Sequence, residues 1–296
     1  MPRIRIGLSG WSYDSWRGDF YPEGLARTRQ LAYASRRFVS LEINGSFYGL
    51  LNPDVYRRFH AETPADFLFA LKGSRFITHN RKLRDAATPL ANFLASGPLL
   101  LREKLGPILW QLEDRTHFDA EKVSSFLELL PRDTMAAARL AKRHDERIGN
   151  PWVGTDRNRR IRHALEIRHP SFFTDEMVRI ARRTGTALAV SDAGKWACTE
   201  ELTAGFVYIR LHGRPRTYFS RYDDAALRHW AERILAWHNG GQPPDAHRIT
   251  DRAPPRRRTR DVYVYFDNDA EGHAFRDAVR LVEMLGLKEG RAGAEG

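Results

Sequence analysis

Residues 206–213 read Phe-Val-Tyr-Ile-Arg-Leu-His-Gly, an apolar run that ends on charged and polar side chains. A short apolar run with such an end is typical of a strand buried within a parallel sheet. Arg210, His212 and Gly213 then lie at the carboxyl end of that strand, where parallel α/β folds place their binding and catalytic groups. The fold depends on how often the chain repeats this pattern.

Seven other apolar runs end in the same way, with polar residues at or just after their last position. They begin at residues 4, 38, 67, 107, 164, 187 and 262. Helical patterns separate them, at residues 27–35, 52–62, 91–101, 119–130, 174–184, 223–239 and 272–285. This alternation indicates a parallel α/β fold, and eight strand-like runs, each followed by a connection, predict a TIM-type (β/α) barrel whose strand ends share one face.

An open doubly wound sheet is the alternative architecture for the same alternation. That fold usually carries a glycine-rich phosphate-binding turn after its first strand. Here the corresponding segment, Gly7-Leu8-Ser9-Gly10, is too short for such a turn and is followed by the bulky Trp11. We therefore expect a barrel, with some irregularity, rather than an open sheet.

The chain of 296 residues, with 42% hydrophobic and 29% charged residues, suits one large domain with a substantial core. We predict a single domain over residues 1–288 and a flexible tail over residues 289–296. Two arginine-rich segments interrupt the alternation, and we expect both to be exposed excursions. Residues 139–162 hold eight Arg or Lys against three acids, and residues 243–260 hold six arginines against two aspartates.

Lys and Arg outnumber Asp and Glu by 48 − 37 = 11. A positive field of this kind attracts phosphates, carboxylates and nucleic acid, although an arginine-rich proteome gives the same excess. The single cysteine, Cys198, excludes a disulfide framework and a thiolate metal cluster, and we expect a small buried residue there. The N-terminus lacks a signal sequence and no apolar run reaches membrane-spanning length, which predicts a cytoplasmic protein with no membrane partner.

The strand ends also carry recognisable blocks of sequence, all in order along the chain. They are Ser9-Gly10-Trp11-Ser12-Tyr13, Glu42-Ile43-Asn44-Gly45-Ser46-Phe47-Tyr48, Phe69-Ala70-Leu71-Lys72, Gly106-Pro107-Ile108-Leu109-Trp110-Gln111-Leu112, Glu166-Ile167-Arg168-His169-Pro170-Ser171, Arg210-Leu211-His212-Gly213-Arg214 and Tyr263-Val264-Tyr265-Phe266-Asp267-Asn268-Asp269. With these blocks the chain resembles the YecE-like family, also called domain of unknown function 72, over about residues 4–285. The resemblance implies a TIM-barrel-type fold and an uncharacterised activity.

Two departures from the family pattern concern charge. The family often has Pro-Pro where this chain has Glu113-Asp114, and it often has Asn where this chain has Asp267. We therefore expect the loop after the fourth strand and the tip of the last strand to differ in charge from those of relatives.

Four ionisable residues at strand ends are the predicted catalytic groups. Glu42 and Glu166 are carboxylates suited to general acid and base roles or to holding a metal. Lys72 ends a very apolar strand, where desolvation favours a neutral amine able to act as a nucleophile, or where its charge holds a phosphate. His212 is suited to moving protons near neutral pH. In the alternative interpretation the glutamates form structural ion pairs with Lys72 and nearby arginines. Buried charges must be paired in either interpretation, so pairing alone does not decide between them.

Ten further residues at the strand ends are predicted to bind substrate. Arg168, Arg210 and Arg214 offer guanidinium groups that match carboxylates or phosphates. The others supply rings, amides or further hydrogen-bonding groups, and they are Trp11, Asn44, Tyr48, Gln111, His169, Asp192 and Asn268. Each has a structural alternative, such as loop bracing for Asn44 beside Gly45 or core packing for the aromatic residues. We assign Trp16, Phe20, Trp230 and Trp237 to the core.

No cofactor is expected from the sequence. It contains no phosphate-binding Gly-x-x-x-x-Gly-Lys run, no Gly-x-Ser-x-Gly elbow and no zinc-protease helix. No closely spaced ligand motif indicates a metal site either, and a divalent metal held by Glu42, Glu166, Asp192 and His212 is a weaker alternative.

The leading functional hypothesis is an enzyme of unresolved reaction class. It would use acid–base chemistry on an anionic small molecule, bearing phosphate or carboxylate, at the carboxyl-end mouth of the barrel. A nucleic-acid-binding or nucleic-acid-processing protein is the second hypothesis, because of the arginine-rich segments and the aromatic residues near the strand ends. A non-catalytic metabolite sensor that uses the same mouth is the third.

Overall fold

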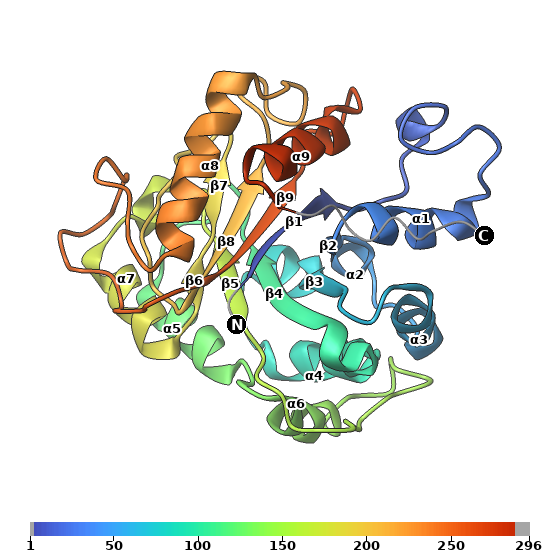
Figure 1. Cartoon of the computed structure of the whole chain (residues 1–296). Coiled ribbons are helices and arrows are strands. Elements are labelled where there is room, and N and C mark those ends of the chain that lie inside the picture. The colour runs from blue at the N-terminus through green and yellow to red at the C-terminus, as the bar shows by residue number, and fades with distance from the viewer. Residues whose placement is uncertain (1–2, 288–296) are drawn as a thin grey trace. The chain divides into compact units, whose positions relative to one another are not determined.

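A computed structural model of the chain describes residues 3–287 and shows strands alternating with helices (Figure 1). The fold is an α/β fold of the TIM-barrel type, as predicted, and the strands of its sheet are parallel. The predicted tail, residues 289–296, lies outside the described residues. The chain divides into two compact units: a first unit of Met1–Glu42 with Ala187–Gly296, and a second unit of Ile43–Thr186.

The first unit has a parallel sheet whose strand order brings distant segments together. It contains β1 (Ile4–Ser9), most of β2 (Ser40–Ile43), β7 (Val190–Asp192), β8 (Phe206–Leu211) and β9 (Asp261–Phe266), in the order β2-β1-β9-β8-β7. In the register of this sheet, Ser9 pairs with Glu42, Leu8 with Phe266, and Leu211 with both Phe266 and Asp192. The polar residues at the carboxyl ends therefore meet at one edge.

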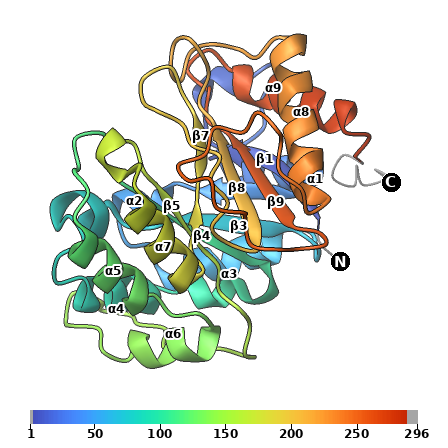
Figure 2. The same ribbon diagram turned by 90° about the vertical axis from the view of Figure 1, so that its left-hand side faces the viewer.

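Helices cover this sheet in a way that the sequence explains. They are α1 (Gln30–Arg37), α8 (Asp224–His238) and α9 (His273–Met284), with short 3₁₀ turns at Asp14–Trp16 and Arg27–Arg29. The short strand β6 (Ala187–Leu188) also belongs to this unit. The α8 helix begins where the Asp223 carboxylate accepts a hydrogen bond from the Ala226 backbone N–H, an N-cap. The α9 helix packs against β1 and β9 (Figures 1 and 2).

The second unit is built on three parallel strands, β3 (Leu68–Lys72), β4 (Leu105–Gln111) and β5 (His163–Glu166), in the order β3-β4-β5. Its helical elements are α2 (Gly45–Tyr48), α3 (Pro53–Glu62), the π-helical turn η3 (Phe76–Asn80), α4 (Ala87–Ala95), η4 (Pro98–Lys104), α5 (Ala120–Leu129), α6 (Thr134–Ala141), η5 (Pro170–Phe172) and α7 (Asp175–Thr184).

Two helix predictions differ from the structure. The helix expected over residues 91–101 is wrong: α4 ends at Ala95 and a separate 3₁₀ segment begins at Pro98. Between them Gly97 has φ 116°, a conformation that glycine adopts without strain, and Pro98 cannot continue the hydrogen bonds of the preceding helix. The sequence prediction also missed α6, which the side chain of Asp133 caps through the Ala136 N–H.

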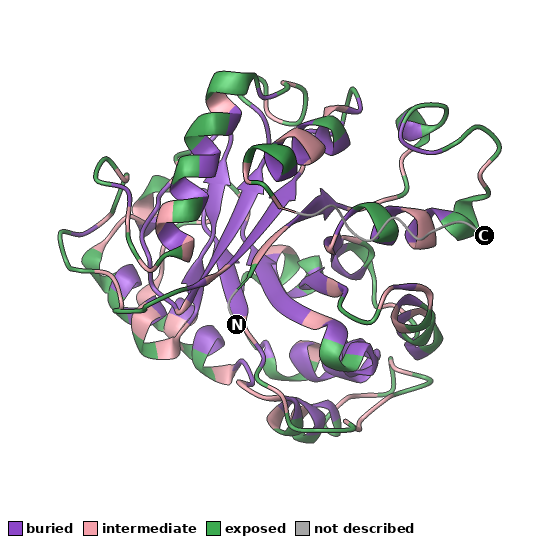
Figure 3. Ribbon diagram, viewed as in Figure 1, coloured by how far each residue is buried: buried purple, intermediate pink, exposed green. Residues whose placement is uncertain are grey.

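The core lies along the strands, which are buried over most of their length (Figure 3). All four aromatic residues assigned to the core are buried, which confirms that prediction: Trp16, Phe20, Trp230 and Trp237. Trp16 also packs edge-on against Phe20 and Phe275, with ring centroids 5.3 and 5.6 Å away. This aromatic contact holds the segment after β1 against α9, beside the carboxyl end of β9.

Candidate active site

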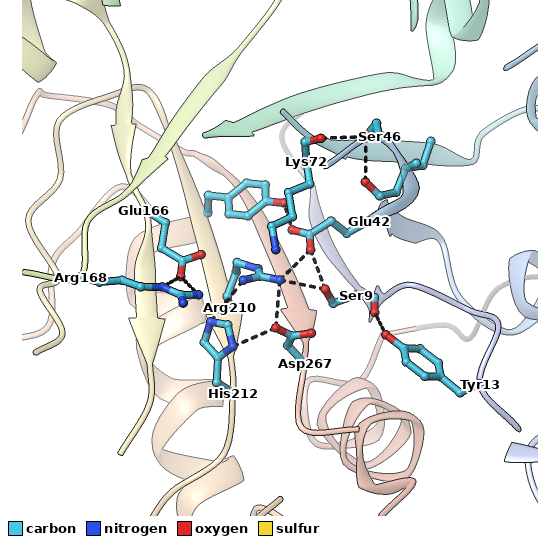
Figure 4. A network of polar contacts seen from close by, with 12 residues as sticks. Ser9, Tyr13, Glu42, Ser46, Lys72, Glu166, Arg168, Arg210, His212 and Asp267 are labelled. Carbon is cyan, nitrogen blue, oxygen red and sulfur yellow. Dashed lines mark hydrogen bonds and ion pairs between the residues drawn. The ribbon is translucent and has the colours of Figure 1, made fainter. Parts of the chain in front are cut away.

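Glu42 is the centre of a buried polar network in the first unit (Figure 4). Its carboxylate has no exposed surface and accepts three hydrogen bonds. The donors are Ser9 Oγ at 2.6 Å, Tyr208 OH at 2.5 Å and Arg210 Nη2 at 2.9 Å. Burial and the nearby Glu42 carboxylate raise the pKa of the Tyr208 hydroxyl well above its usual value, so Tyr208 stays a proton donor to Glu42. A buried carboxylate with such donors is fixed in place.

Arg210 joins Glu42 to a second carboxylate at the tip of β9. Its Nη2 lies 2.9 Å from Glu42 Oε1 and 3.0 Å from Asp267 Oδ2. One guanidinium therefore faces two carboxylates, one fully buried and one with a side chain 15% exposed. Because each charge is compensated by a neighbour, the cluster avoids most of the cost of burying isolated ions.

His212 lies on the same side of β8 as Arg210, two residues along the strand direction. Its Nδ1 is 2.9 Å from Asp267 Oδ2, and its Nε2 is 3.4 Å from Arg210 Nη1. The imidazole is fully buried, with the ring of Trp196 centred 5.1 Å away and that of Tyr218 5.5 Å away. Figure 4 shows Arg210 and His212 both directed at Asp267.

A cavity of about 330 Å³ opens beside Asp267. Its lining comes entirely from the first unit: Tyr13, Ser15, Tyr218, Asp267, Asp269 and Ala270. The volume lies at the lower end of the range for small-molecule sites. Two carboxylates, three hydroxyl groups and two aromatic rings thus surround one space.

Asp269 is a carboxylic acid of this cavity whose acidity is altered by its surroundings. Its Oδ1 accepts a 2.6 Å hydrogen bond from Trp16 Nε1, while its buried Oδ2 has no hydrogen-bond partner within residues 3–287. Burial raises the pKa of Asp269 to about 7; the Trp16 bond opposes this and the charge of Asp267 adds to it. About half of the Asp269 carboxyl groups therefore carry a proton at neutral pH.

Two glycines let the chain fold into this arrangement. Gly10 has φ 91°, and a Cβ there would lie 2.8 Å from Tyr13 OH, so glycine allows Tyr13 to donate to the Ser9 carbonyl at 2.5 Å. Gly213 has φ 89°, and a Cβ there would lie 2.6 Å from the Ser220 carbonyl oxygen. The loop after Gly213 then places Tyr218 at φ 73°, an uncommon conformation for a bulky residue and one often found near functional sites.

A second branch of the network braces the loops around the cavity. Asp192 lies 2.5 Å from Arg214 Nε and accepts from Tyr222 OH at 2.9 Å, and that hydroxyl in turn accepts from the Gly213 N–H. The buried Asn268 donates to Asp277 at 2.8 Å and to the Ser220 carbonyl at 3.1 Å. The structure thus brings the predicted residues Asp192, Arg214 and Asn268 into the loops around the cavity, mainly as supports.

The second unit contains the predicted pair Glu166 and Arg168. Glu166 is fully buried, with Arg168 Nη2 at 2.5 Å and Nε at 2.7 Å from the same Oε1. Lys72 Nζ lies 4.1 Å from the centre of the Phe47 ring, a cation–π contact, and the Lys72 carbonyl accepts from Ser46 Oγ at 2.7 Å. Catalytic roles for Glu166 and Lys72 remain predictions.

The other predicted binding residues differ widely in exposure. Gln111 is buried at the end of β4, beside Glu166 in the β4–β5 register. The imidazole of His169 stacks at 4.0 Å from that of His117, and Tyr48 is 68% exposed. Asn44 and Trp11 are half-buried, and their carbonyl groups accept hydrogen bonds from the Phe47 N–H and the Tyr21 hydroxyl respectively.

Comparison with known proteins identifies the family. The family described as "Protein of unknown function DUF72" matches residues 5–295 of the chain. This chain belongs to the DUF72 family. UPF0759 protein YunF of Bacillus subtilis is 24% identical over 96% of the chain and 95% of its own length, and UPF0759 protein YecE of Escherichia coli is 34% identical over 31% of each chain.

Solved DUF72 structures share the fold of this DUF72 protein. A DUF72 family protein from Thermotoga maritima matches with a TM-score of 0.70 at 23% identity, over 96% of this chain and 99% of that one. One from Enterococcus faecalis matches with a TM-score of 0.68 at 17% identity, over 97% and 96% of the two chains. In this DUF72 protein, no helix of the described region has the length and apolar character needed to cross a membrane.

Sequence reasoning did not assign several residues of this DUF72 site, among them Ser9, Tyr208, Asp267 and Asp269. Tyr208 could have been found by strand alternation, because it shares one face of β8 with Arg210 and His212. Asp269 gave no such signal, since its altered acidity depends on burial in the folded protein, an effect that the hydrogen bond from Trp16 opposes.

Metal and thiol chemistry receive no support from the described part of this DUF72 protein. Within residues 3–287, no group of three or more His, Cys, Asp or Glu side chains has the arrangement of a metal site. Burial raises the pKa of the Cys198 thiol to about 12, so the thiolate that would act as a nucleophile is scarce at neutral pH.

Proposed function

We propose that this DUF72 protein is an enzyme that transfers protons in the cavity beside β9, with Asp269 as general acid and Asp267 as general base. The observation that carries the proposal is that Asp269, a carboxyl group able to hold a proton at neutral pH, lines one cavity together with a second carboxyl group, Asp267. Burial holds the pKa of Asp269 at about 7, whereas Arg210 lies 3.0 Å from Asp267 and compensates its charge. Carboxyl pairs whose surroundings separate their acidities are a recurrent basis of acid–base catalysis.

The roles follow from what each carboxyl group holds at neutral pH. A general acid must carry a proton near the working pH and sit within reach of the reacting group. Asp269 meets the first condition and lines the cavity. Asp267 lines the same cavity as a carboxylate, so it can accept a proton from a hydroxyl group or from water. Glu42 and His212 act as positioning residues, because Glu42 holds Arg210 and His212 contacts Asp267.

The cavity suits a neutral, hydroxyl-bearing substrate. Its polar groups are carboxyl and hydroxyl groups, which donate to and accept from alcohols, and its aromatic residues Tyr13 and Tyr218 offer apolar faces. The cavity lining holds the carboxyl groups of Asp267 and Asp269 and no arginine, lysine or histidine side chain. This lining favours a neutral substrate over the anionic ligand predicted from the sequence.

The test combines a ligand screen with one substitution. Monosaccharides, polyols and their nitrophenyl derivatives are screened by thermal shift, and compounds that stabilise the protein are followed by NMR for turnover. For a substrate found in this way, Asp269→Asn is expected to lower kcat by about 10²–10⁴-fold, the usual contribution of general acid–base catalysis. The pH profile of the variant should also lose the limb near pH 7 that Asp269 provides.

Asp66→Asn is the matched control, because Asp66 is an exposed aspartate of the second unit. It should leave both kcat and the pH profile unchanged. Wild-type turnover by Asp269→Asn would refute the proposal. A compound that binds in this cavity and is never converted would point instead to a metabolite sensor.

A nucleic-acid-binding function is the second candidate, favoured by one surface of the first unit. Arg256, Arg257 and Arg258 are exposed and line a surface cavity of about 500 Å³ that has no acidic residue in its lining. Arg260 anchors this segment from inside, donating to the carbonyls of Pro255 at 2.7 Å and Gly241 at 3.1 Å. Three exposed arginines around one surface cavity suit contact with a phosphate backbone.

Gel-shift titration of a labelled 20-mer, single- or double-stranded, tests this second candidate. We expect binding at low salt that weakens steeply as salt rises, because each phosphate contact releases counterions. Replacing Arg256, Arg257 and Arg258 together by Gln should flatten the salt dependence by about two to three units of log–log slope. The absence of any shift at low salt would eliminate this function.

A further inference from the structure

The second unit has a cavity of about 470 Å³, a volume typical of small-molecule sites. Its lining is arginine, amide and aromatic, and contains no carboxylate: Tyr48, Gly49, Leu50, Ser74, Arg75, Phe76, Asn80, Pro89, Asn92 and Arg147. We propose that this cavity binds a small molecule that combines a planar ring with a phosphate or carboxylate group. The proposal is independent of the acid–base function, since every lining residue belongs to the second unit.

The apolar part of the site is an exposed aromatic rim. Tyr48 is 68% exposed, Phe76 43% and Leu50 41%. Among the large apolar side chains of the described second unit, only Met135 is comparably exposed. Large apolar side chains gathered at a concave surface mark ligand-binding positions. Two aromatic rings at the rim of one cavity suit a planar ligand, because offset ring stacking is favourable.

The cationic part of the site is Arg75, supported by Arg147. The Arg75 guanidinium lies 5.9 Å from the centre of the Tyr48 ring, and no carboxylate of the described residues pairs with it. Arg147 is 65% exposed and lies 3.8 Å from Asp145 Oδ2, too far for a strong ion pair. An arginine beside an aromatic ring can pair with a phosphate or carboxylate while the ring of the ligand stacks.

The loop that carries Arg147 is fixed to α4 by Asn92. Its amide donates to Asp145 Oδ1 at 2.9 Å, and its carbonyl oxygen accepts from the Asp145 N–H at 3.0 Å. Asp145 also accepts from the Arg147 N–H at 3.1 Å. Asn92 therefore acts as a positioning residue that holds the second arginine at the cavity.

The segment after β3 is an unusual backbone element, and it supplies Phe76 and Asn80 to the cavity. Residues 76–80 form a π-helical turn, closed by a 2.9 Å hydrogen bond from the Arg81 N–H to the Phe76 carbonyl. Three of the next residues, Lys82, Leu83 and Asp85, have positive φ without being glycine. Such π turns and strained conformations occur preferentially at functional sites.

Binding of four probes tests the proposal: phenyl phosphate, benzoate, phenol and inorganic phosphate. Titrations followed by NMR of ring-labelled Tyr and Phe should show shifts of Tyr48 and Phe76 with phenyl phosphate or benzoate, and at least tenfold weaker binding of phenol and inorganic phosphate. Comparison of phenyl phosphate with benzoate decides which anionic group the site prefers. Arg75→Gln and Tyr48→Ala should each raise Kd at least tenfold, which corresponds to about 1.4 kcal/mol.

Arg139→Gln is the matched control, since Arg139 is an exposed arginine of the same unit outside the cavity. Both test positions are exposed, so the variants should melt like the wild type. Equal binding of phenol and phenyl phosphate would refute the role of charge. The proposal also fails if Arg139→Gln weakens binding as much as Arg75→Gln, or if no probe shifts Tyr48 or Phe76 at millimolar concentration.

Discussion

Arg210→Met should lower the free energy of unfolding by about 3–5 kcal/mol at pH 7, the usual loss when one partner of a buried ion pair is removed. The reason is local. Glu42 is fully buried, and both Glu42 and Asp267 lie within 3.0 Å of the same Nη2 atom. Without the guanidinium, two carboxylates face each other in a poorly solvated place. Urea denaturation monitored by tryptophan fluorescence measures the change.

One further measurement separates this cause from simple loss of packing. Adding Glu42→Gln and Asp267→Asn to Arg210→Met should recover much of the loss, since a neutral cluster has no uncompensated charge. A single variant that loses less than about 1 kcal/mol would show that the network is not an important source of stability.

Asp269→Asn should remove a pH dependence of stability that the wild type shows between about pH 4 and pH 7. The pKa of Asp269 is raised from 3.8 in the unfolded chain to about 7 in the folded protein. The folded state therefore binds this proton more tightly. The stabilisation is fully present below about pH 4 and is lost as pH rises through about 7.

The expected size of this effect is on the order of 2 kcal/mol, because one pKa unit corresponds to about 1.4 kcal/mol and partial solvent access reduces the full shift. Above pH 7 the Asp269→Asn variant should thus be more stable than the wild type. Near pH 4 the variant should be equally stable or less stable than the wild type. Urea midpoints at four pH values, with Asp66→Asn as control, measure this. Parallel stability curves for wild type and Asp269→Asn would show that Asp269 titrates normally.

The parts of the fold set by local sequence could be predicted. The helix at 175–184 begins where Thr174 accepts from the Met177 N–H and ends at Gly185 with φ 63°, as its Thr-Asp-Glu start and glycine end indicated. The helix prediction over residues 91–101 followed the continuous apolar pattern across Gly97-Pro98. In the structure the glycine and the proline break the helix in spite of that hydrophobic periodicity.

Only part of the candidate site could be predicted. The sequence indicates which residues lie at strand ends, but the burial and the contacts that set the acidity of a side chain arise only in the folded protein. Strand ends revealed that Glu42, Arg210 and His212 lie where chemistry is usual, and the structure joins them to one another through direct contacts. The acidity of Asp269 depends on its burial and on the indole of Trp16, which is 253 positions away in the sequence. Neither local propensity nor residue spacing contains that information.

The suppressed acidity of Cys198 makes the chain convenient for spectroscopy. Alkylating reagents attack thiolates, and this thiol has a pKa of about 12. The natural protein should therefore react more slowly with maleimide dyes at neutral pH than a protein with an exposed, ordinary thiol. A cysteine introduced by Tyr48→Cys, at an exposed position, would then carry a single fluorophore or spin label that reports on the rim of the second-unit cavity.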